Sequence, residues 1–213
     1  MSIDQIRNYQ REESVVFLKV KEAFGGLSNM AGGFPLEVNG IHIPSSEALY
    51  QTCRFPDLPE VQRKIIKQKS PMTAKMVSKP HRKDSRKDWM LHRVKIMRWC
   101  LRVKLAQNWE PFSQLLLTTG EKAIVEESHK DGFWGAKPTD EQTLVGENVL
   151  GRLLMELREE IKVKDIKYFL IVEPIKINKF LLNEKPIKRV TKVRKLRSHI
   201  NDNAAQQTSL FDD

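Results

Sequence analysis

The stretch from Met90 to Leu105 constrains the fold most, because its apolar residues recur every three or four positions. That spacing predicts a long helix whose buried face is formed by Met90, Val94, Met97, Leu101 and Leu105, with arginines on its other faces. A second apolar series of this kind runs from Val149 to Ile161. The fold is therefore expected to be built mainly from helices.

Short β-branched and aromatic runs predict only a few short strands among these helices. They are residues 15–20 and 168–172, together with a hairpin over residues 34–43 that turns at Asn39-Gly40. Further helices are expected to begin at Ser45, Pro59 and Pro71. Because helices and strands do not alternate as in a βαβ chain, we predict a predominantly helical α+β fold, a single compact domain with a few short strands.

Composition divides the chain into four segments. We expect residues 1–13 to form a short helix or a loose arm, 14–162 the compact domain, 163–184 a C-terminal strand or extension, and 185–213 a basic, disordered tail. No apolar run is long enough to cross a bilayer and the polar start is not typical of a signal peptide, so no membrane contact is expected. Two isolated cysteines, Cys53 and Cys100, favour a reducing cytoplasm.

The formal net charge is +10, and much of the basic excess lies near the C-terminus. Residues 185–197 contain seven Lys or Arg and no acid. A basic excess favours polyanionic partners, nucleic acid ahead of an anionic membrane. Apolar residues recur at every third position of this stretch, so a helix formed on binding, a docked strand and a solvated tail all remain open.

Residues 126–135 form a loop between an apolar run and the second long helix. It holds charged groups, two glycines and two aromatic rings in one connection, and functional side chains are common in such loops. An ordinary turn explains the same residues, because Asp131-Gly132 is a good turn pair and Phe133 and Trp134 are large enough to fill a core. Considered alone, the loop favours the turn.

Other candidate residues also have simple structural roles. Glu47 at a helix start is stabilised by the helix dipole, Trp89 suits a core position, and Asn148 suits a helix cap. Residues 25–33 are rich in glycine, so the backbone there can approach a ligand, but they lack the order of a phosphate-binding loop. The five histidines are scattered without the spacing of metal ligands, so no metal site is expected.

Taken in order, however, these residues resemble one family, NADAR (YbiA-like), over residues 14–162. The ordered series is Phe17 with Lys19, Gly26-Leu27-Ser28-Asn29, Pro44-Ser45-Ser46-Glu47 with Tyr50-Gln51 and Phe55, Ser70-Pro71-Met72, Arg86-Lys87-Asp88-Trp89 with Met97, Leu116-Leu117-Thr118-Thr119-Gly120, Val125-Glu126, Asp131 with Trp134-Gly135, Gly146-Glu147-Asn148-Val149-Leu150-Gly151, and Leu154-Met155-Glu156-Leu157-Arg158. So many motifs in the same order make the resemblance specific.

The resemblance implies a compact, mostly helical fold without a metal or another cofactor. It also implies an N-glycosidase that acts on NAD-derived or ADP-ribose-derived compounds. Some members are similar to enzymes that cleave riboflavin-pathway intermediates. Others remove ADP-ribose from guanine in DNA and so oppose a toxin that adds it.

Glycosidase chemistry suits the residue types in these motifs. Cleaving a ribosyl C–N bond builds positive charge on the sugar, which a fixed carboxylate stabilises, while a second group protonates the leaving base or activates water. On the family's motif positions we expect Glu47 and Asp131 to form this catalytic pair, with the division of roles open. A covalent route through an imine at Lys19 also remains open.

The resemblance further implies a set of substrate contacts. Two tryptophans are expected to stack on a base or wall the pocket, an asparagine to bind ribose or diphosphate, and basic groups to meet phosphate. The full set is Lys19, Gly26, Ser28, Asn29, Tyr50, Arg86, Lys87, Trp89, Trp134, Gly135 and Asn148. Three positions depart from the family pattern, namely Met30, Ala48 and Arg54; the last of these excludes a mechanism that needs an amine at position 54.

The segment Gln207-Thr208-Ser209-Leu210-Phe211 resembles the pentapeptide that binds the bacterial sliding clamp. In that motif Gln207 would anchor, while Leu210 and Phe211 would fill a hydrophobic pocket; an accidental match and a folded-back end remain open. Together with the basic stretch, it favours an antitoxin-like, cytoplasmic enzyme that hydrolyses ADP-ribose from guanine in DNA. The rivals are an N-glycosidase of riboflavin intermediates or other ADP-ribose-like ligands, and a non-catalytic adaptor of DNA and the clamp.

Overall fold

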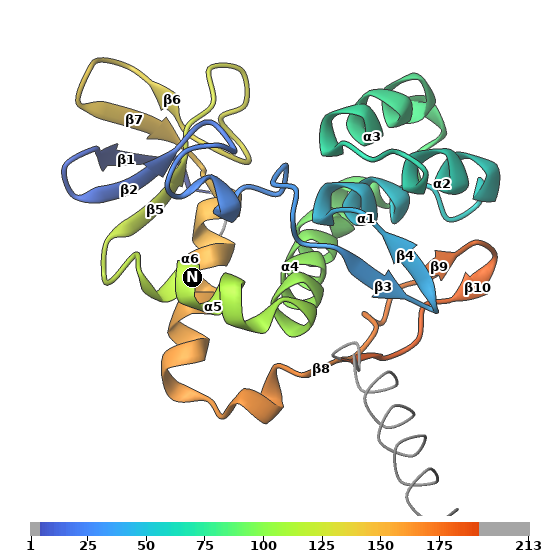
Figure 1. Cartoon of the computed structure of the whole chain (residues 1–213). Helices are drawn as coiled ribbons and strands as arrows, with labels where there is room; N and C mark the ends of the chain where they lie inside the picture. The colour runs from blue at the N-terminus through green and yellow to red at the C-terminus, as the bar shows by residue number, and fades with distance from the viewer. Residues whose placement is uncertain (1–4, 192–213) are drawn as a thin grey trace, which may run out of the picture.

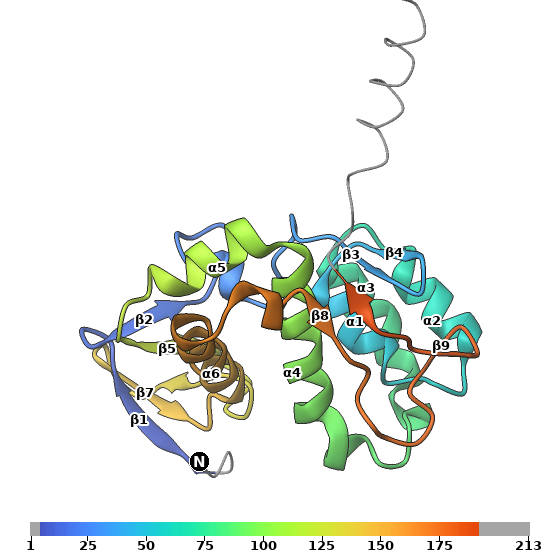
Figure 2. The same ribbon diagram turned by 90° about the horizontal axis from the view of Figure 1, so that it is seen from below.

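The computed structural model describes residues 5–191, and within them helix α4 (Trp89–Gln107) runs through the middle (Figure 1). One side of α4 carries α1 (Ser46–Thr52), α2 (Pro59–Ile66), α3 (Pro71–Ser78) and the hairpin of β3 (Leu36–Val38) and β4 (Ile41–Ile43). The other side carries α5 (Trp109–Leu117), α6 (Val149–Val163) and a group of short strands, as the view from below also shows (Figure 2). The predicted α+β class, mostly helical with short strands, is confirmed.

Local signals placed several elements correctly. The hairpin turns at Asn39 and Gly40, both with positive φ, as an Asn-Gly turn requires. Helix α1 begins at the predicted serine cap, where Ser45 Oγ accepts a hydrogen bond from the Ala48 amide at 3.2 Å. Helices α2 and α3 each begin with their predicted proline.

The strands of the other side bring distant segments together. Strand β2 (Ser14–Phe17) pairs in parallel with β5 (Ala123–Glu126), and the register sets Phe17 opposite Glu126. Strand β7 (Thr143–Gly146) pairs with β6 (Lys137–Pro138) and with β1 (Arg7–Gln10). The described part of residues 1–13 therefore contains a strand, not the expected short helix or loose arm. The sequence signal for this strand is weak, because Tyr9 is the one buried residue among its polar neighbours.

The predicted long helix α4 is present, but its buried face begins later than the sequence pattern suggests. Met90 is 68% exposed, whereas Met97, Leu101 and Leu105 are buried as expected. The C-terminal half of α4 is covered on almost every side, because elements pack against it from both halves of the molecule. No helix in the described part of the chain, α4 included, is long and apolar enough to cross a membrane.

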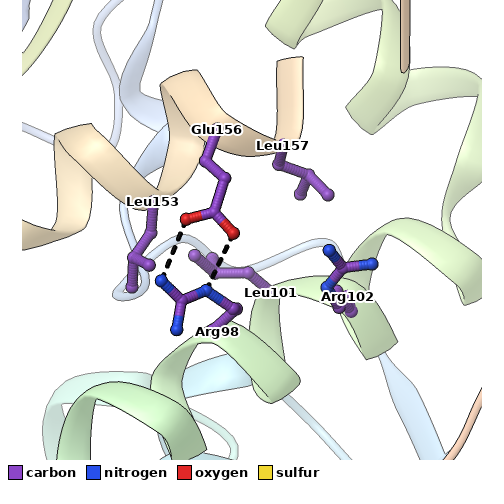
Figure 3. Close-up of a pocket in the computed structure, with 6 residues that line it drawn as sticks. All are labelled: Arg98, Leu101, Arg102, Leu153, Glu156 and Leu157. Carbon is purple, nitrogen blue, oxygen red and sulfur yellow. Dashed lines mark hydrogen bonds and ion pairs between the residues drawn. The ribbon is translucent and has the colours of Figure 1, made fainter. Parts of the chain in front are cut away.

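Helices α4 and α6 pack through leucines and are bridged by ion pairs. Arg98 Nε lies 2.9 Å from Glu156 Oε1, and Arg102 pairs with Glu160 at 2.6 Å. Figure 3 shows Arg98 and Glu156 facing each other across a pocket whose other lining residues are Leu101, Arg102, Leu153 and Leu157. None of the predicted site residues lines this pocket, so we assign it a packing role.

The C-terminal part of the described chain folds back onto the helices. After the 3-10 helix Ile166–Tyr168, strand β8 (Ile171–Val172) pairs with β11 (Val190–Thr191), and β9 (Leu181–Leu182) pairs with β10 (Lys185–Pro186). We expected a disordered tail from residue 185, but residues 185–191 are packed, with Ile187 and Val190 buried. The expected contacts of Gln207, Leu210 and Phe211 lie outside the described residues.

Candidate active site

Glu47 lies in the first turn of α1 and is 5% exposed. Asn29 Nδ2 donates to its Oε2 at 2.6 Å, and Gln51 Nε2 donates to its Oε1 at 2.8 Å. Gln51 is held in turn by the Ser78 hydroxyl, which donates to Gln51 Oε1 at 2.9 Å. Both carboxylate oxygens thus accept amide hydrogen bonds, a pattern that suits a fixed negative charge.

The site contains a third carboxylate, Glu126 at the end of β5, which is not among the predicted site residues. Its pKa is raised from 4.5 to about 7, first by burial and then by the negative charges of Glu47 and Asp131, against a smaller opposing effect of Lys75. The charges of both predicted acids, Glu47 and Asp131, therefore raise the pKa of Glu126. The sequence carried one signal for it, the Val125-Glu126 pair within the resembling series.

Asp131 is exposed and helps to form the turn that follows β5. Its Oδ1 accepts hydrogen bonds from the backbone amides of Phe133 and Trp134, both at 3.0 Å. The simple structural role of Asp131 is therefore present in the structure. Its other oxygen accepts no hydrogen bond from the described residues. The negative charge of Asp131 also raises the pKa of Glu126.

The loop that carries Asp131 is docked on the first turn of α6. Four consecutive loop carbonyls accept hydrogen bonds from backbone amides at the start of that helix: Gly132 from Glu147 at 2.7 Å, Phe133 from Val149 at 2.9 Å, Trp134 from Leu150 at 3.0 Å, and Gly135 from Asn148 at 3.0 Å. These bonds satisfy N–H groups that a helix otherwise leaves open. The loop is consequently held at several points, which fixes its aromatic side chains.

A row of aromatic rings borders Glu47. The Tyr50 ring lies 5.1 Å from that of Trp89 and 5.7 Å from that of Trp134, which lies 5.0 Å from Phe133. Tyr50 and Trp89 are buried, whereas Trp134 and Phe133 are partly exposed. Burial raises the Tyr50 pKa well above its usual value, and the charge of Glu47 is the next cause. The rings thus form an apolar wall beside the carboxylates, a surface on which a flat base can stack.

Residues 16–162 match the family model described as the NADAR domain. The chain belongs to the NADAR family. It is 32% identical to N-glycosidase YbiA of Escherichia coli (strain K12) over 160 residues, which are 75% of this chain and 96% of that protein. The NMR structure of the E. coli protein YbiA has a TM-score of 0.60 and covers 76% of this chain and 94% of its own. The predicted family is confirmed.

Other relatives of the NADAR chain differ in length. Riboflavin biosynthesis protein VVA0006 of Vibrio vulnificus (strain YJ016) is 36% identical over 159 residues, which are 74% of this chain but 41% of that longer protein. N-glycosidase Npun_R5314 of Nostoc punctiforme is 30% identical over 156 residues, 70% of this chain and 93% of that protein. The predicted enzyme class agrees with the names of the E. coli and Nostoc relatives, which are both called N-glycosidases.

Several residues of the NADAR domain that were predicted to contact substrate instead contact the backbone of β5. Asn148 has a positive φ of 48°, and its side chain donates to the Ile124 carbonyl at 2.8 Å and accepts from the Glu126 amide at 3.1 Å. A Cβ at Gly135 would lie 2.3 Å from the Glu126 carbonyl oxygen. Both positions therefore hold the backbone of Glu126 in place.

The glycine-rich loop of the NADAR domain is held from below by a buried lysine. Lys104 is 0% exposed, and its Nζ donates to the carbonyls of Gly26 at 2.7 Å and Ser28 at 3.3 Å. Burial lowers the Lys104 pKa from 10.5 to about 7. The predicted contacts Gly26 and Ser28 thus present their carbonyls to Lys104, while Asn29 of the same loop reaches Glu47.

The basic residues predicted to meet phosphate are not gathered at the carboxylates. Arg86 is buried, pairs with Asp88 at 2.6 Å, and donates to the Asn178 carbonyl at 2.7 Å. These contacts fasten the C-terminal segment through Nε and Nη2 of Arg86, whereas its buried Nη1 has no hydrogen-bond partner among the described residues. Lys87 and Lys19 are exposed, and Lys19 follows two residues after Phe17, the partner of Glu126 in the strand pair.

Proposed function

We propose that this NADAR chain is an N-glycosidase that hydrolyses the ribosyl C–N bond of ADP-ribose attached to guanine in DNA. The observation that carries the proposal is the convergence of Glu47, Glu126 and Asp131 beside a wall of aromatic rings. Cleavage of this bond needs a negative charge near the sugar and a proton for the leaving base. The site offers groups suited to both.

Glu47 is the group best suited to stabilise the sugar. Its two oxygens are held by Asn29 and Gln51, so the charge needs little reorganisation as the oxocarbenium-like state forms. The Oδ1 atom of Asn29 is buried and has no hydrogen-bond partner among the described residues. We assign that oxygen to accept a hydrogen bond from a ribose hydroxyl, which would bring the sugar against Glu47.

Glu126 is the group best suited to move protons. With a pKa raised to about 7, it is partly protonated at neutral pH and can both give and take a proton. In the proposed cycle Glu126 donates its proton to the leaving guanine as the C–N bond breaks. A water molecule then adds to the anomeric carbon and returns a proton to Glu126, so the enzyme ends as it began. Asp131 contributes by keeping the Glu126 pKa high and remains the alternative base for that water.

The argument for a DNA substrate is the positive charge of the chain. The chain has a net charge of +10, and the 3-10 helix Lys79–Asp84 beside α3 exposes several basic side chains. Basic surface favours a polyanionic substrate. A guanine within a duplex would have to leave the stack, and single-stranded DNA would avoid that cost. The second candidate is a ribosyl intermediate of riboflavin synthesis, which the name of the Vibrio relative favours.

The decisive experiment is incubation of the full chain with ADP-ribosylated single-stranded DNA. We expect release of ADP-ribose, and a loss of about 10²–10³-fold in rate for Glu47→Gln, the range for removal of one electrostatic stabiliser. Asp131→Asn preserves an acceptor for the turn and removes the charge, so it should also slow the reaction.

Three outcomes would contradict the proposal. No release by the wild type, together with turnover of a riboflavin intermediate, favours the small-molecule enzyme. No turnover of either substrate favours the DNA and clamp adaptor. If Glu47→Gln and Asp131→Asn both release ADP-ribose as fast as the wild type, neither carboxylate takes part in the reaction.

A further inference from the structure

Arg54 and Arg93 lie against rings of the aromatic wall, and the charge of Arg82 acts on Arg54; all three arginines lack acidic partners among the described residues. None of the ion pairs within residues 5–191 involves them. By contrast, Arg98 and Arg102 on the same helix as Arg93 are each paired with a glutamate. Arginines elsewhere on α4 are therefore neutralised by glutamates, whereas these three arginines have no acidic partner among the described residues.

Arg54 is held in a defined position at one end of the wall. Its Cζ lies 4.8 Å from the centre of the Trp89 ring, and its Nε donates to the Ser85 hydroxyl at 2.6 Å. Its backbone carbonyl accepts a hydrogen bond from the Arg86 amide at 2.9 Å. Stacking on the ring and the bond from Nε leave the outer N–H groups of the guanidinium available to a ligand.

Arg93 occupies the other end of the same wall. Its Cζ lies 3.5 Å from the centre of the Phe133 ring. The row of groups is therefore Arg54, Trp89, Tyr50, Trp134, Phe133 and Arg93. The charges of Arg54 and Arg93 both act on Tyr50, the ring in the middle, beside Glu47.

The positive charges also act on one another. The pKa of Arg54 is lowered first by its partial burial and then by the charges of Arg82 and Arg93. Ser85 connects two of these residues, because its hydroxyl accepts from Arg54 and donates to the Arg82 carbonyl. Like charges held together in this way repel one another, and a bound anion relieves that repulsion.

We infer that Arg54 and Arg93 form a phosphate subsite that binds the sugar-phosphate part of the substrate. The inference rests on the proposed N-glycosidase function, since it places phosphate oxygens at the wall where the base and ribose would lie. Guanidinium groups suit this role, because their planar N–H edges match phosphate oxygens in pairs. The subsite replaces Arg86, whose Nε and Nη2 are committed to Asp88 and to the Asn178 carbonyl.

Binding of ADP-ribose to the full chain, measured by isothermal titration calorimetry, tests the subsite. We expect Arg54→Met and Arg93→Met each to raise the Kd about 10-fold or more, the range for loss of a hydrogen bond to a charged group. Arg54→Lys should fall between wild type and Arg54→Met, because it keeps the charge and loses the planar edge. Arg98→Met is the matched control, since Arg98 lies on the same helix and is already paired. Thermal unfolding of each variant shows whether it folds.

Two further ligands separate the sources of phosphate. Adenosine lacks phosphate, so its weaker binding should not change in Arg54→Met or Arg93→Met. If these variants instead weaken binding of an unmodified single-stranded oligonucleotide and leave ADP-ribose unaffected, the arginines contact the DNA backbone and the inference is wrong. Equal losses for adenosine and ADP-ribose would also overturn it, because the arginines would then act on the base or the fold.

The failure of the inference and the failure of the proposed function are distinguishable. A chain that cleaves ADP-ribosylated DNA but binds ADP-ribose equally well in the wild type and in both methionine variants retains the function and loses the subsite. A chain that cleaves no ribosyl substrate, yet binds ADP-ribose through Arg54 and Arg93, retains the subsite and loses the function.

Discussion

Glu47 and Glu126 are the same chemical group in two regions that treat it differently. In the helical region each oxygen of Glu47 accepts an amide hydrogen bond, and a second layer through Ser78 supports one of those amides. In the strand and loop region the Glu126 side chain accepts no hydrogen bond from any described residue and lies in the field of two other carboxylates. Its pKa is raised to about 7.

The difference teaches how one site obtains two functions from one residue type. Hydrogen bonds to an ionised carboxylate stabilise its charge, whereas burial without partners and nearby negative charges favour its protonated form. The helical region thus gives Glu47 two amide donors, whereas the strand and loop region raises the pKa of Glu126. Divergent environments of this kind are how neighbouring acids come to have different catalytic roles.

The strongest test of this comparison is Glu126→Gln. We expect the rate at pH 7 to fall about 10²-fold or more, because the proposed general acid is lost. The wild-type rate should decline as the pH rises through about 7, where Glu126 loses its proton, and that decline should be absent from the variant. Rates on ADP-ribosylated DNA from pH 5 to 9 measure both effects. An unchanged pH profile in the variant would assign the proton transfer to another group.

A smaller effect is expected from Asn29→Ala, which removes one of the two amides that hold Glu47. We expect the rate to fall about 10-fold, because the loss of one charge-assisted hydrogen bond costs roughly 1.5–3 kcal/mol and only part of that loss appears in the transition state. The decline above pH 7 should remain, since Glu126 is untouched. Steady-state kinetics of this variant, with Asn178→Ala as a control far from Glu47 in the sequence, checks the expectation. A shifted pH profile would show that the two carboxylates are not separately controlled.

The smallest expected effect concerns stability and Lys104. The folded protein binds this proton less tightly than the unfolded chain, with a pKa of about 7 against 10.5. The contribution of Lys104 to the free energy of unfolding therefore increases as the pH rises from 7 toward 10.5 and is lost as the pH falls through 7.

Replacement of Lys104 by Met removes this titration and keeps most of the apolar stem. The wild type should gain on the order of 1–2 kcal/mol relative to Lys104→Met between pH 7 and pH 9. Urea unfolding of both proteins at the two pH values provides the measurement. Parallel changes in the two proteins would mean that Lys104 carries the same charge at both pH values.

Much of the fold followed from local patterns. The serine cap at Ser45, the proline that begins α3, the Asn-Gly hairpin and the apolar series of α4 and α6 depend on residues close in sequence. All of these elements are present. Sequence patterns gave wrong predictions where the structure of a segment depends on a partner far away in the sequence. Met90 continues the apolar series but is exposed, and the polar strand β1 exists because β7 pairs with it.

The candidate site divides in the same way. Resemblance placed Glu47, Asn29, Tyr50, Trp89 and Trp134 in one site, and the structure brings their side chains into the same neighbourhood. It could not assign Arg86 to the C-terminal segment, because that contact joins residues 92 positions apart. Nor could it show that Lys104 supports the glycine-rich loop from 78 positions away.

The sequence by itself determined the family, the helix starts and the residue types of the site, because these depend on short-range order that the chain displays directly. Only the tertiary structure decided that Glu47 accepts two amide hydrogen bonds and that the pKa of Glu126 is raised to about 7. The reason is physical: a pKa follows from burial and from the distance to other charges, and both quantities arise when segments far apart in the chain meet.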